Sequence, residues 1–248
     1  MLSAVTASKS SDAQSTRLPD AAAEHAAHRG EKFLAVAKPL LRGWLHLGAT
    51  PIAVIMGSLL LPFVHTSRAL FAVTLYTLCS VVLFGMSALY HRFDWKPHTK
   101  AMLRRFDHAN IFLLIAGTYT PLALLALPPE KGWVLFWLVW AVALVGIVFN
   151  VLWISAPRPI YLALYLGTGW IAVMYLGDLL DASVAMMVLI LVGGLIYTAG
   201  AVVYGMKRPN PWPNHFGFHE IFHFATVAAW VCHWVAILLI VLNPVVGG

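Results

Sequence analysis

The sequence predicts an all-α membrane protein, a seven-transmembrane helical bundle with its N-terminus in the cytoplasm and its C-terminus outside. Of its 248 residues, 60% are hydrophobic and only 10% are charged, and the mean hydropathy is +0.80. Globular chains are roughly a quarter charged, and apolar runs of about 18 or more residues are typical of membrane helices. This composition excludes a soluble globular domain.

Seven apolar runs predict the seven helices. Each run is close to the roughly 20 residues that cross a hydrocarbon core of about 30 Å. The fifth is the shortest in its apolar part, because Gly167 and Gly169 interrupt it and two aspartates follow it. The connections are brief, which favours one compact bundle. We place the spans at residues 43–64, 69–91, 108–128, 132–154, 159–177, 183–206 and 219–242.

The polar N-terminal part stands apart from the spans. Residues 1–30 are rich in Ser and Ala, and we expect a disordered cytoplasmic tail. They lack the basic start, apolar core and cleavage site of a cleavable signal peptide. Residues 31–42 mix apolar and basic side chains, which favours an interfacial amphipathic segment, although Pro39 interrupts it. Residues 43–248 form the seven-transmembrane domain.

The basic residues predict the orientation of the spans. Fourteen of the 16 lysines and arginines lie in the tail or in connections on one side, and Arg68 and Lys131 lie on the other. Basic residues near span ends are retained in the cytoplasm. The net charge of +6 reflects this bias, and anionic lipid headgroups at the cytoplasmic face are its expected partner. The sequence indicates no nucleic acid and no particular protein partner.

Two histidine motifs lie at cytoplasmic span ends. "MSALYH" places Ser87 and His91 four residues apart, and "HEIFH" places His219 and His223 at the same spacing. Residues four apart share a helical face, and the predicted topology puts both motifs and Asp107 at one depth. Three imidazoles with one position left open are the ligand set of a catalytic zinc site. A nearby carboxylate and hydroxyl can hold the metal-bound water.

Each of these residues also has an ordinary explanation. A single histidine at a membrane interface is commonly an amphipathic ring, and Asp107 in the first turn of the third span can complement the helix dipole. His46 and His108, at cytoplasmic span ends, either support the zinc ligands or are simply interfacial. His233 lies ten residues beyond His223, about 15 Å deeper, which is too far to join the site.

"HEIFH" also matches H-E-x-x-H, in which the glutamate is the general base of a zinc protease. Glu220 would then serve an intramembrane metalloprotease. Such enzymes need a further ligand downstream, and the sequence has no L-D-G signature. Its acidic "GDLLD" falls on the opposite side of the membrane. The metalloprotease stays open as an alternative.

"GTYTP" in the third span has a structural explanation of its own. Gly117 permits close helix approach, Thr118 and Thr120 can donate to backbone carbonyls, and Pro121 can bend the span. The bend would open a lipid-sized cavity beneath the metal. Helix packing alone explains the motif equally well.

Three motifs in this order resemble the hemolysin III family, bacterial relatives of the progestin and adipoQ receptors that are distantly related to alkaline ceramidases. They are "SALYHRF", "RRFDHANIFLLIAGTYTP" and "FGFHEIFHFATVAAWVCHW". The resemblance covers residues 40–243, and only the N-terminal tail departs from it. It implies a multi-pass integral protein of the bacterial plasma (inner) membrane.

The resemblance also implies a site. His91, His219 and His223 would bind Zn2+, with Asp107 holding the metal-bound water and Ser87 beside it. In ceramidases, and by proposal in adiponectin receptors, this constellation hydrolyses the amide of a lipid. Zinc lowers the pKa of bound water and polarises a carbonyl, and Asp107 can accept the water's proton. The expected function is a zinc-dependent, ceramidase-like hydrolase acting on a membrane lipid amide or ester.

Two further classes remain open. One is a receptor-like or membrane lipid homeostasis protein whose zinc is structural and whose ligand is a membrane lipid. The other is the pore-forming hemolysin suggested by the family name. A pore needs a polar wall, and these spans carry no charged residue at mid-depth, where intramembrane charges normally mark ion pathways. The pore therefore ranks lowest.

Overall fold

The structure is a computed structural model that describes residues 39–153 and 155–245. Within these ranges the chain is helical and contains no β-strand. Seven of its helical segments are long and apolar enough to cross a membrane. The predicted all-α fold with seven spans is confirmed, and the protein is a multi-pass integral membrane protein, while the orientation of its termini stays a prediction. The predictions for residues 1–30, and for residues 31–38 of the amphipathic segment, lie outside the described residues.

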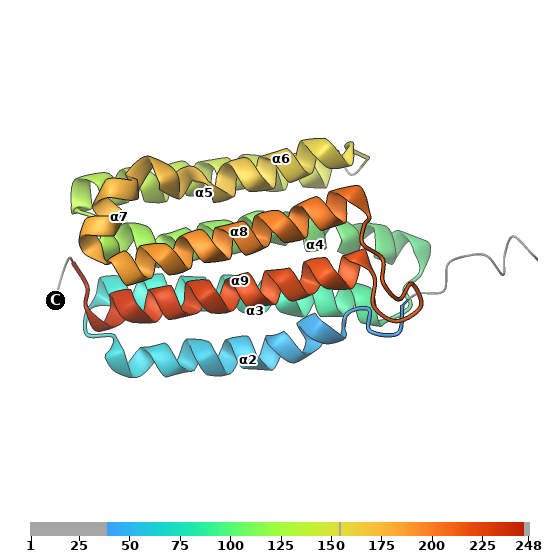
Figure 1. Cartoon of the computed structure of the whole chain (residues 1–248), viewed down its shortest axis with the longest axis horizontal. Helices are drawn as coiled ribbons and strands as arrows, with labels where there is room; N and C mark the ends of the chain where they lie inside the picture. The colour runs from blue at the N-terminus through green and yellow to red at the C-terminus, as the bar shows by residue number, and fades with distance from the viewer. Residues whose placement is uncertain (1–38, 154, 246–248) are drawn as a thin grey trace, which may run out of the picture. The chain divides into compact units, whose positions relative to one another are not determined.

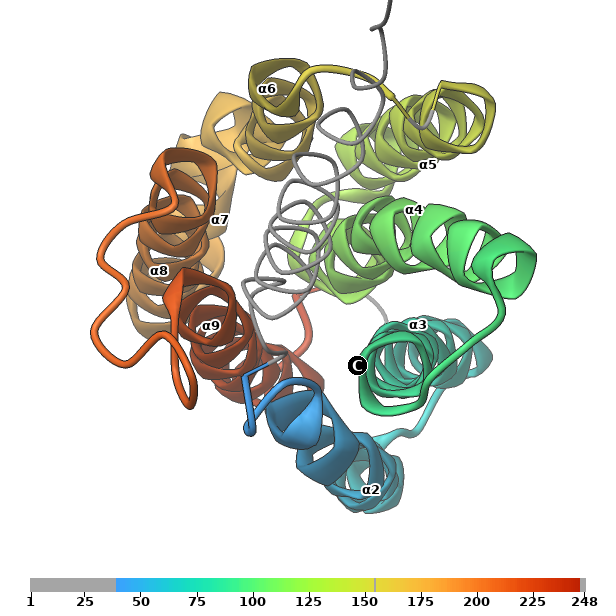
Figure 2. The same cartoon turned by 90° about the vertical axis from the view of Figure 1, so that its right-hand side faces the viewer.

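The helices lie side by side with roughly parallel axes (Figure 1), and the view along the bundle shows them arranged in a ring in which α4 lies between α3 and α5 (Figure 2). The apolar stretch of the third span, which contains α4, is 78% buried, compared with at most 50% for any other span. The elements in order are α2 (Trp44–Leu60), η1 (Leu61–Phe63), α3 (Ser67–Arg92), α4 (Pro97–Pro121), η2 (Leu122–Ala126), α5 (Pro129–Leu152), α6 (Arg158–Gly169), η3 (Ile171–Tyr175), α7 (Leu176–Ala182), α8 (Val184–Met206) and α9 (Phe218–Leu242).

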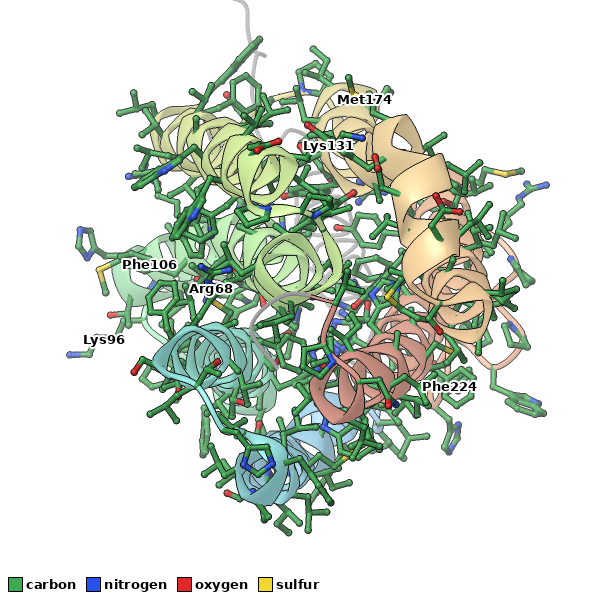
Figure 3. The ribbon with its side chains drawn as sticks, turned by 90° about the vertical axis from the view of Figure 1, so that its left-hand side faces the viewer. Arg68, Lys96, Phe106, Lys131, Met174 and Phe224 are labelled. Carbon is green, nitrogen blue, oxygen red and sulfur yellow. The ribbon has the colours of Figure 1, made fainter. Side chains whose placement is uncertain are left out.

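Large apolar side chains cover the outside of the bundle. Met174 is 76% exposed and Phe224 is 58% exposed, and both point away from the helices in Figure 3. A monomeric protein in water rarely exposes apolar patches beyond a few hundred Å². In a bilayer the same surface faces lipid, while the helices satisfy their own backbone hydrogen bonds. The exposed apolar surface therefore agrees with the predicted membrane location.

The third span begins earlier than its hydropathy predicts. We placed its start at residue 108, whereas α4 starts at Pro97. A proline fits the first turn of a helix because its missing N–H would have no partner there. The first turns of α4 carry charged residues, so hydropathy does not detect them. Asp107 consequently lies well inside α4, and its predicted position in the first turn, with a role at the helix dipole, is wrong.

The "GTYTP" stretch has the contacts that its residue types predict. A Cβ at Gly117 would lie 2.5 Å from the Cβ of Cys79 on α3, so only glycine allows this approach. The hydroxyls of Thr118 and Thr120 donate to carbonyls four residues earlier, at 2.9 Å each. After Pro121 the chain continues as the π-helix η2. Rare π-helical turns of this kind change the course of a helix.

The fifth span is divided into three pieces. α6 ends at Gly169, and the short helices η3 and α7 complete the crossing. The hydroxyl of Tyr119 on α4 bridges the break, because it donates to the Gly169 carbonyl at 2.7 Å and accepts from the Ala172 amide at 2.6 Å. The aspartates after the break lie far from the histidine motifs, and Asp178 pairs with Lys131 at 2.6 Å.

The seven crossings place Pro39 and Val245 at opposite ends of the bundle (Figure 1). Figure 3 looks at the end that carries Arg68 and Lys131. From the positive-inside rule we expect a reporter fused after Gly248 to lie outside the cytoplasm and one fused near Ser10 to lie inside. Alkaline phosphatase and green fluorescent protein fusions measure this. Both reporters on one side of the membrane would contradict the orientation.

Candidate metal centre

The fold brings three imidazoles together at one end of the bundle. His91 lies in the last turn of α3, and His219 and His223 lie in the first two turns of α9. Their candidate ligand atoms all lie within 4.8 Å of one another. The Nε2 atoms of His91 and His219 are 3.3 Å apart. His91 and His223 are buried and His219 is half-buried. The structure therefore joins two motifs that are 128 residues apart.

The donor set fits a zinc ion. Zinc in proteins is tetrahedral, with zinc–nitrogen distances of about 2.0–2.1 Å, so two ligand nitrogens are about 3.3 Å apart. The separation of the His91 and His219 Nε2 atoms has this value. Three imidazoles leave a fourth tetrahedral position for a water molecule or a substrate. The cluster can hold a metal ion, and its chemistry favours zinc.

A carboxylate and a hydroxyl flank the three imidazoles. The Asp107 Oδ2 lies 3.6 Å from the His91 Nε2. Ser87 lies one turn before His91 on α3 and is buried, and it lines the same cavity as Asp107. All five predicted site residues thus lie in one place. Their roles as ligands, proton acceptor and support remain predictions.

Glu220, the acidic residue of "HEIFH", binds Gly217 and Arg42. It is 1% exposed. Its Oε2 accepts from the backbone N–H of Gly217 at 2.9 Å, which caps α9. Its Oε1 accepts from the Nε of Arg42, in an ion pair between residues 178 positions apart. Both carboxylate oxygens are engaged, whereas a zinc protease needs this carboxylate free to act on water.

The sequence allows two interpretations of His46 and His108, as supports of the zinc ligands or as interfacial residues. His46 is not interfacial: it is 3% exposed, and its ring lies face to face with that of His223, with centroids 3.9 Å apart and planes 3° apart. His108 instead faces Tyr161, at 5.6 Å between ring centroids. His233 lies outside the cluster, as predicted, and its Nε2 is 3.2 Å from the Ile190 carbonyl oxygen.

An apolar cavity extends from the histidines into the bundle. Its lining begins at Asp107, His219 and His223 and continues to Leu122 on η2 and Met187 on α8. From Asp107 to Leu122 the helix rises about 22 Å, compared with about 30 Å for a whole hydrocarbon core. The cavity therefore begins at the candidate metal centre and crosses much of the depth of the membrane.

The threonine side chains of the cavity wall are satisfied by their own helices. The hydroxyls of Thr118, Thr198 and Thr226 donate to backbone carbonyls four residues earlier, at 2.7–2.9 Å. These threonines consequently present mainly their methyl groups to the cavity. The wall suits a hydrocarbon chain, because most of the surface that lines the cavity is apolar. A cavity is therefore present beside the candidate metal centre, and its occupation by a lipid stays a prediction.

Sequence comparison supports the same family. Residues 34–234 match the family described as Haemolysin-III related. The chain is 34% identical over 151 residues to the Hemolysin-3 homolog of Bacillus subtilis (strain 168), across 60% of this chain and 68% of that protein. It is 31% identical over 140 residues to Hemolysin-3 of Bacillus cereus, across 56% and 64%.

A shorter match reaches a eukaryotic receptor-like protein. The chain is 43% identical over 49 residues to the ADIPOR-like receptor IZH2 of Saccharomyces cerevisiae (strain ATCC 204508 / S288c), across 18% of this chain and 16% of that protein. This agrees with the superfamily that the three motifs indicate. With 201 of its residues inside the matched range, the chain belongs to the Haemolysin-III related family.

Proposed function

We propose that the protein is a zinc-dependent hydrolase of an amide or ester bond in a membrane lipid, acting at the cytoplasmic face of the bacterial inner membrane. The observation that carries the proposal is the position of the histidine cluster and Asp107 at the head of the apolar cavity. A lipid acyl chain in this cavity would place its polar linkage beside the three imidazoles.

The chain's own residues have separate roles in this proposal. His91, His219 and His223 hold the zinc, which supplies a Lewis acid and lowers the pKa of water. The Asp107 Oδ2, 3.6 Å from the His91 Nε2, accepts a proton from the attacking water and returns it to the leaving group. Ser87 supports the carboxylate. The apolar wall binds the acyl chain and excludes bulk water.

The lipid partner is an amphipathic molecule with one acyl chain in the cavity and its headgroup at the cytoplasmic surface. Basic residues surround that end of the bundle and favour anionic headgroups nearby. Among the described residues they are Arg42, Arg92, Lys96, Lys100, Arg104, Arg105, Arg158, Lys207 and Arg208.

A test uses the purified full chain in detergent, loaded with zinc and incubated with a total lipid extract of the source bacterium. Mass spectrometry before and after incubation should show free fatty acid and one deacylated lipid rising with time. A chelator should stop the release and added zinc should restore it. A zinc-replete protein that releases no acyl chain from any lipid class in the extract would contradict the hydrolase.

A receptor-like or lipid homeostasis protein with structural zinc is the second candidate. The specific observation in its favour is the match to a yeast protein named as an ADIPOR-like receptor. The receptor-like candidate predicts the same zinc content, but its function in cells should not depend on a proton acceptor. The metalloprotease alternative is weaker, because Glu220 caps α9 and pairs with Arg42.

A further inference from the structure

The five residues before and within the first turn of α2, Arg42–His46, touch both helices that carry the candidate zinc ligands. We call this stretch, "RGWLH", the α2 lead-in. Figure 2 shows α2 beside α3 and α9 at the end of the bundle where the histidines lie. Four of the five residues contact α3 or α9 at or beside a candidate zinc ligand. The contacts are an ion pair, a ring stack, a close backbone approach and a cation–π contact.

Two contacts join the lead-in to α9. Arg42 pairs through its Nε with Glu220, and His46 stacks on His223. Arg42 lies in the turn before α2 and His46 lies in the first turn of that helix, while Glu220 and His223 are three residues apart on α9. Residues three apart on a helix are neighbours on one face. The ion pair and the stacked rings are therefore successive contacts along the same α2–α9 interface.

Two further contacts join the lead-in to α3. Gly43 has a φ of 81°, and a Cβ on it would lie 3.0 Å from the His91 Cβ. Only glycine adopts this conformation without strain and allows this approach. The guanidinium carbon of Arg92 lies 4.3 Å from the centroid of the Trp44 ring. The lead-in thus rests directly against His91 and the residue that follows it.

The His46 ring contacts His223 through its face and not through its nitrogens. The ring approaches the His223 backbone, yet neither ring nitrogen makes a hydrogen bond of good geometry within the part of the chain that the structure describes. The edge of the pair is closed by Phe84, at 5.2 Å between centroids and 68° between planes. A buried imidazole without hydrogen bonds is costly, and the observed ring contacts with His223 and Phe84 offset that cost.

The ring of a metal-bound histidine is usually oriented by a hydrogen bond from its second nitrogen. Among the described residues, no hydrogen bond holds the His223 ring. We propose that His46 is a positioning residue, whose stacked ring orients His223 for zinc in place of that hydrogen bond, and that the α2 lead-in aligns α3 and α9 around the metal. This inference rests on the proposed zinc site.

The test compares two substitutions that both fill the space of the ring. His46→Phe keeps a flat aromatic face, and His46→Leu removes it. We measure zinc affinity of the purified full chain by competition with a chromophoric chelator, and the visible absorption bands of the protein loaded with Co2+ in place of zinc. His46→Leu should weaken zinc binding by about 10-fold or more and alter the cobalt bands. His46→Phe should stay within about threefold of the wild type and keep the bands, since stacking survives.

A His46→Leu variant with wild-type zinc affinity and unaltered cobalt bands would overturn the inference. A His46→Phe variant that binds zinc as weakly as His46→Leu would also overturn it. A wild-type chain that takes up neither metal would instead refute the zinc site itself, which separates the two failures. Gly43→Ala tests the lead-in without touching the His46 ring, should His46→Leu not fold. It should lower zinc affinity by about threefold or more, because it displaces His91, and unchanged affinity there would count against the lead-in.

Discussion

Asp107→Asn should abolish most lipid turnover while leaving the zinc in place. The change keeps the size of the side chain and removes the proton acceptor. Removing a general base typically costs roughly two or more orders of magnitude in rate. The zinc should be largely retained, with an affinity loss of about 10-fold or more, because Asp107 lies beside the imidazoles without belonging to the three-histidine cluster, like an outer-shell partner. Acyl release and metal content are measured on the same zinc-saturated preparation.

Glu220→Gln is the matched control, since it makes the same carboxylate-to-amide change at a residue that does not line the cavity. Assayed with saturating zinc, it should lose less than about 10-fold in turnover, compared with the loss of a general base in Asp107→Asn. An inactive Glu220→Gln beside an active Asp107→Asn would favour the metalloprotease mechanism. An Asp107→Asn variant that functions in cells close to wild type would favour a receptor-like protein with structural zinc.

His219→Ala and His91→Ala should each lose most of the bound zinc. Each substitution removes one of three protein ligands, and a site with two imidazoles cannot retain the metal at comparable affinity. His233→Ala is the matched control, because His233 is also a buried histidine on the same helix as His219 but bonds to the Ile190 carbonyl. It should keep its zinc. Elemental analysis after gel filtration measures all three variants.

Equal zinc retention by His219→Ala and His233→Ala would show that the metal is bound elsewhere. Loss of zinc in all three variants, with the fold intact by gel filtration, would point to a general effect of removing a buried histidine. Only selective loss supports the cluster of His91, His219 and His223 as the site.

The hydropathy of the sequence predicts the spans well where a helix is apolar along its whole length. The seventh span, predicted over residues 219–242, is α9 over Phe218–Leu242. It fails for α4, whose charged first turns begin at Pro97. It also does not register that the fifth span is divided at Gly169, since a break in a helix changes hydrogen bonding without changing hydropathy.

The candidate ligands were predictable because helical spacing and topology together place them at one depth. The pairing of Arg42 with Glu220 was not, because no local pattern links residues 178 positions apart. His46 is an intermediate case. It begins a stripe of buried residues at helical spacing in α2, followed by Ala49, Ala53, Gly57 and Leu60. That pattern predicts a packed histidine, and it was available in the sequence.

The zinc content of the purified wild-type chain tests the central claim most directly. The protein is purified without added metal, dialysed, and its zinc is quantified per chain by mass spectrometry. Three imidazoles converging within 4.8 Å of one another predict about one zinc per chain. A well-folded chain that holds no zinc, and takes up none when it is supplied, would contradict the metal centre and the hydrolase built on it.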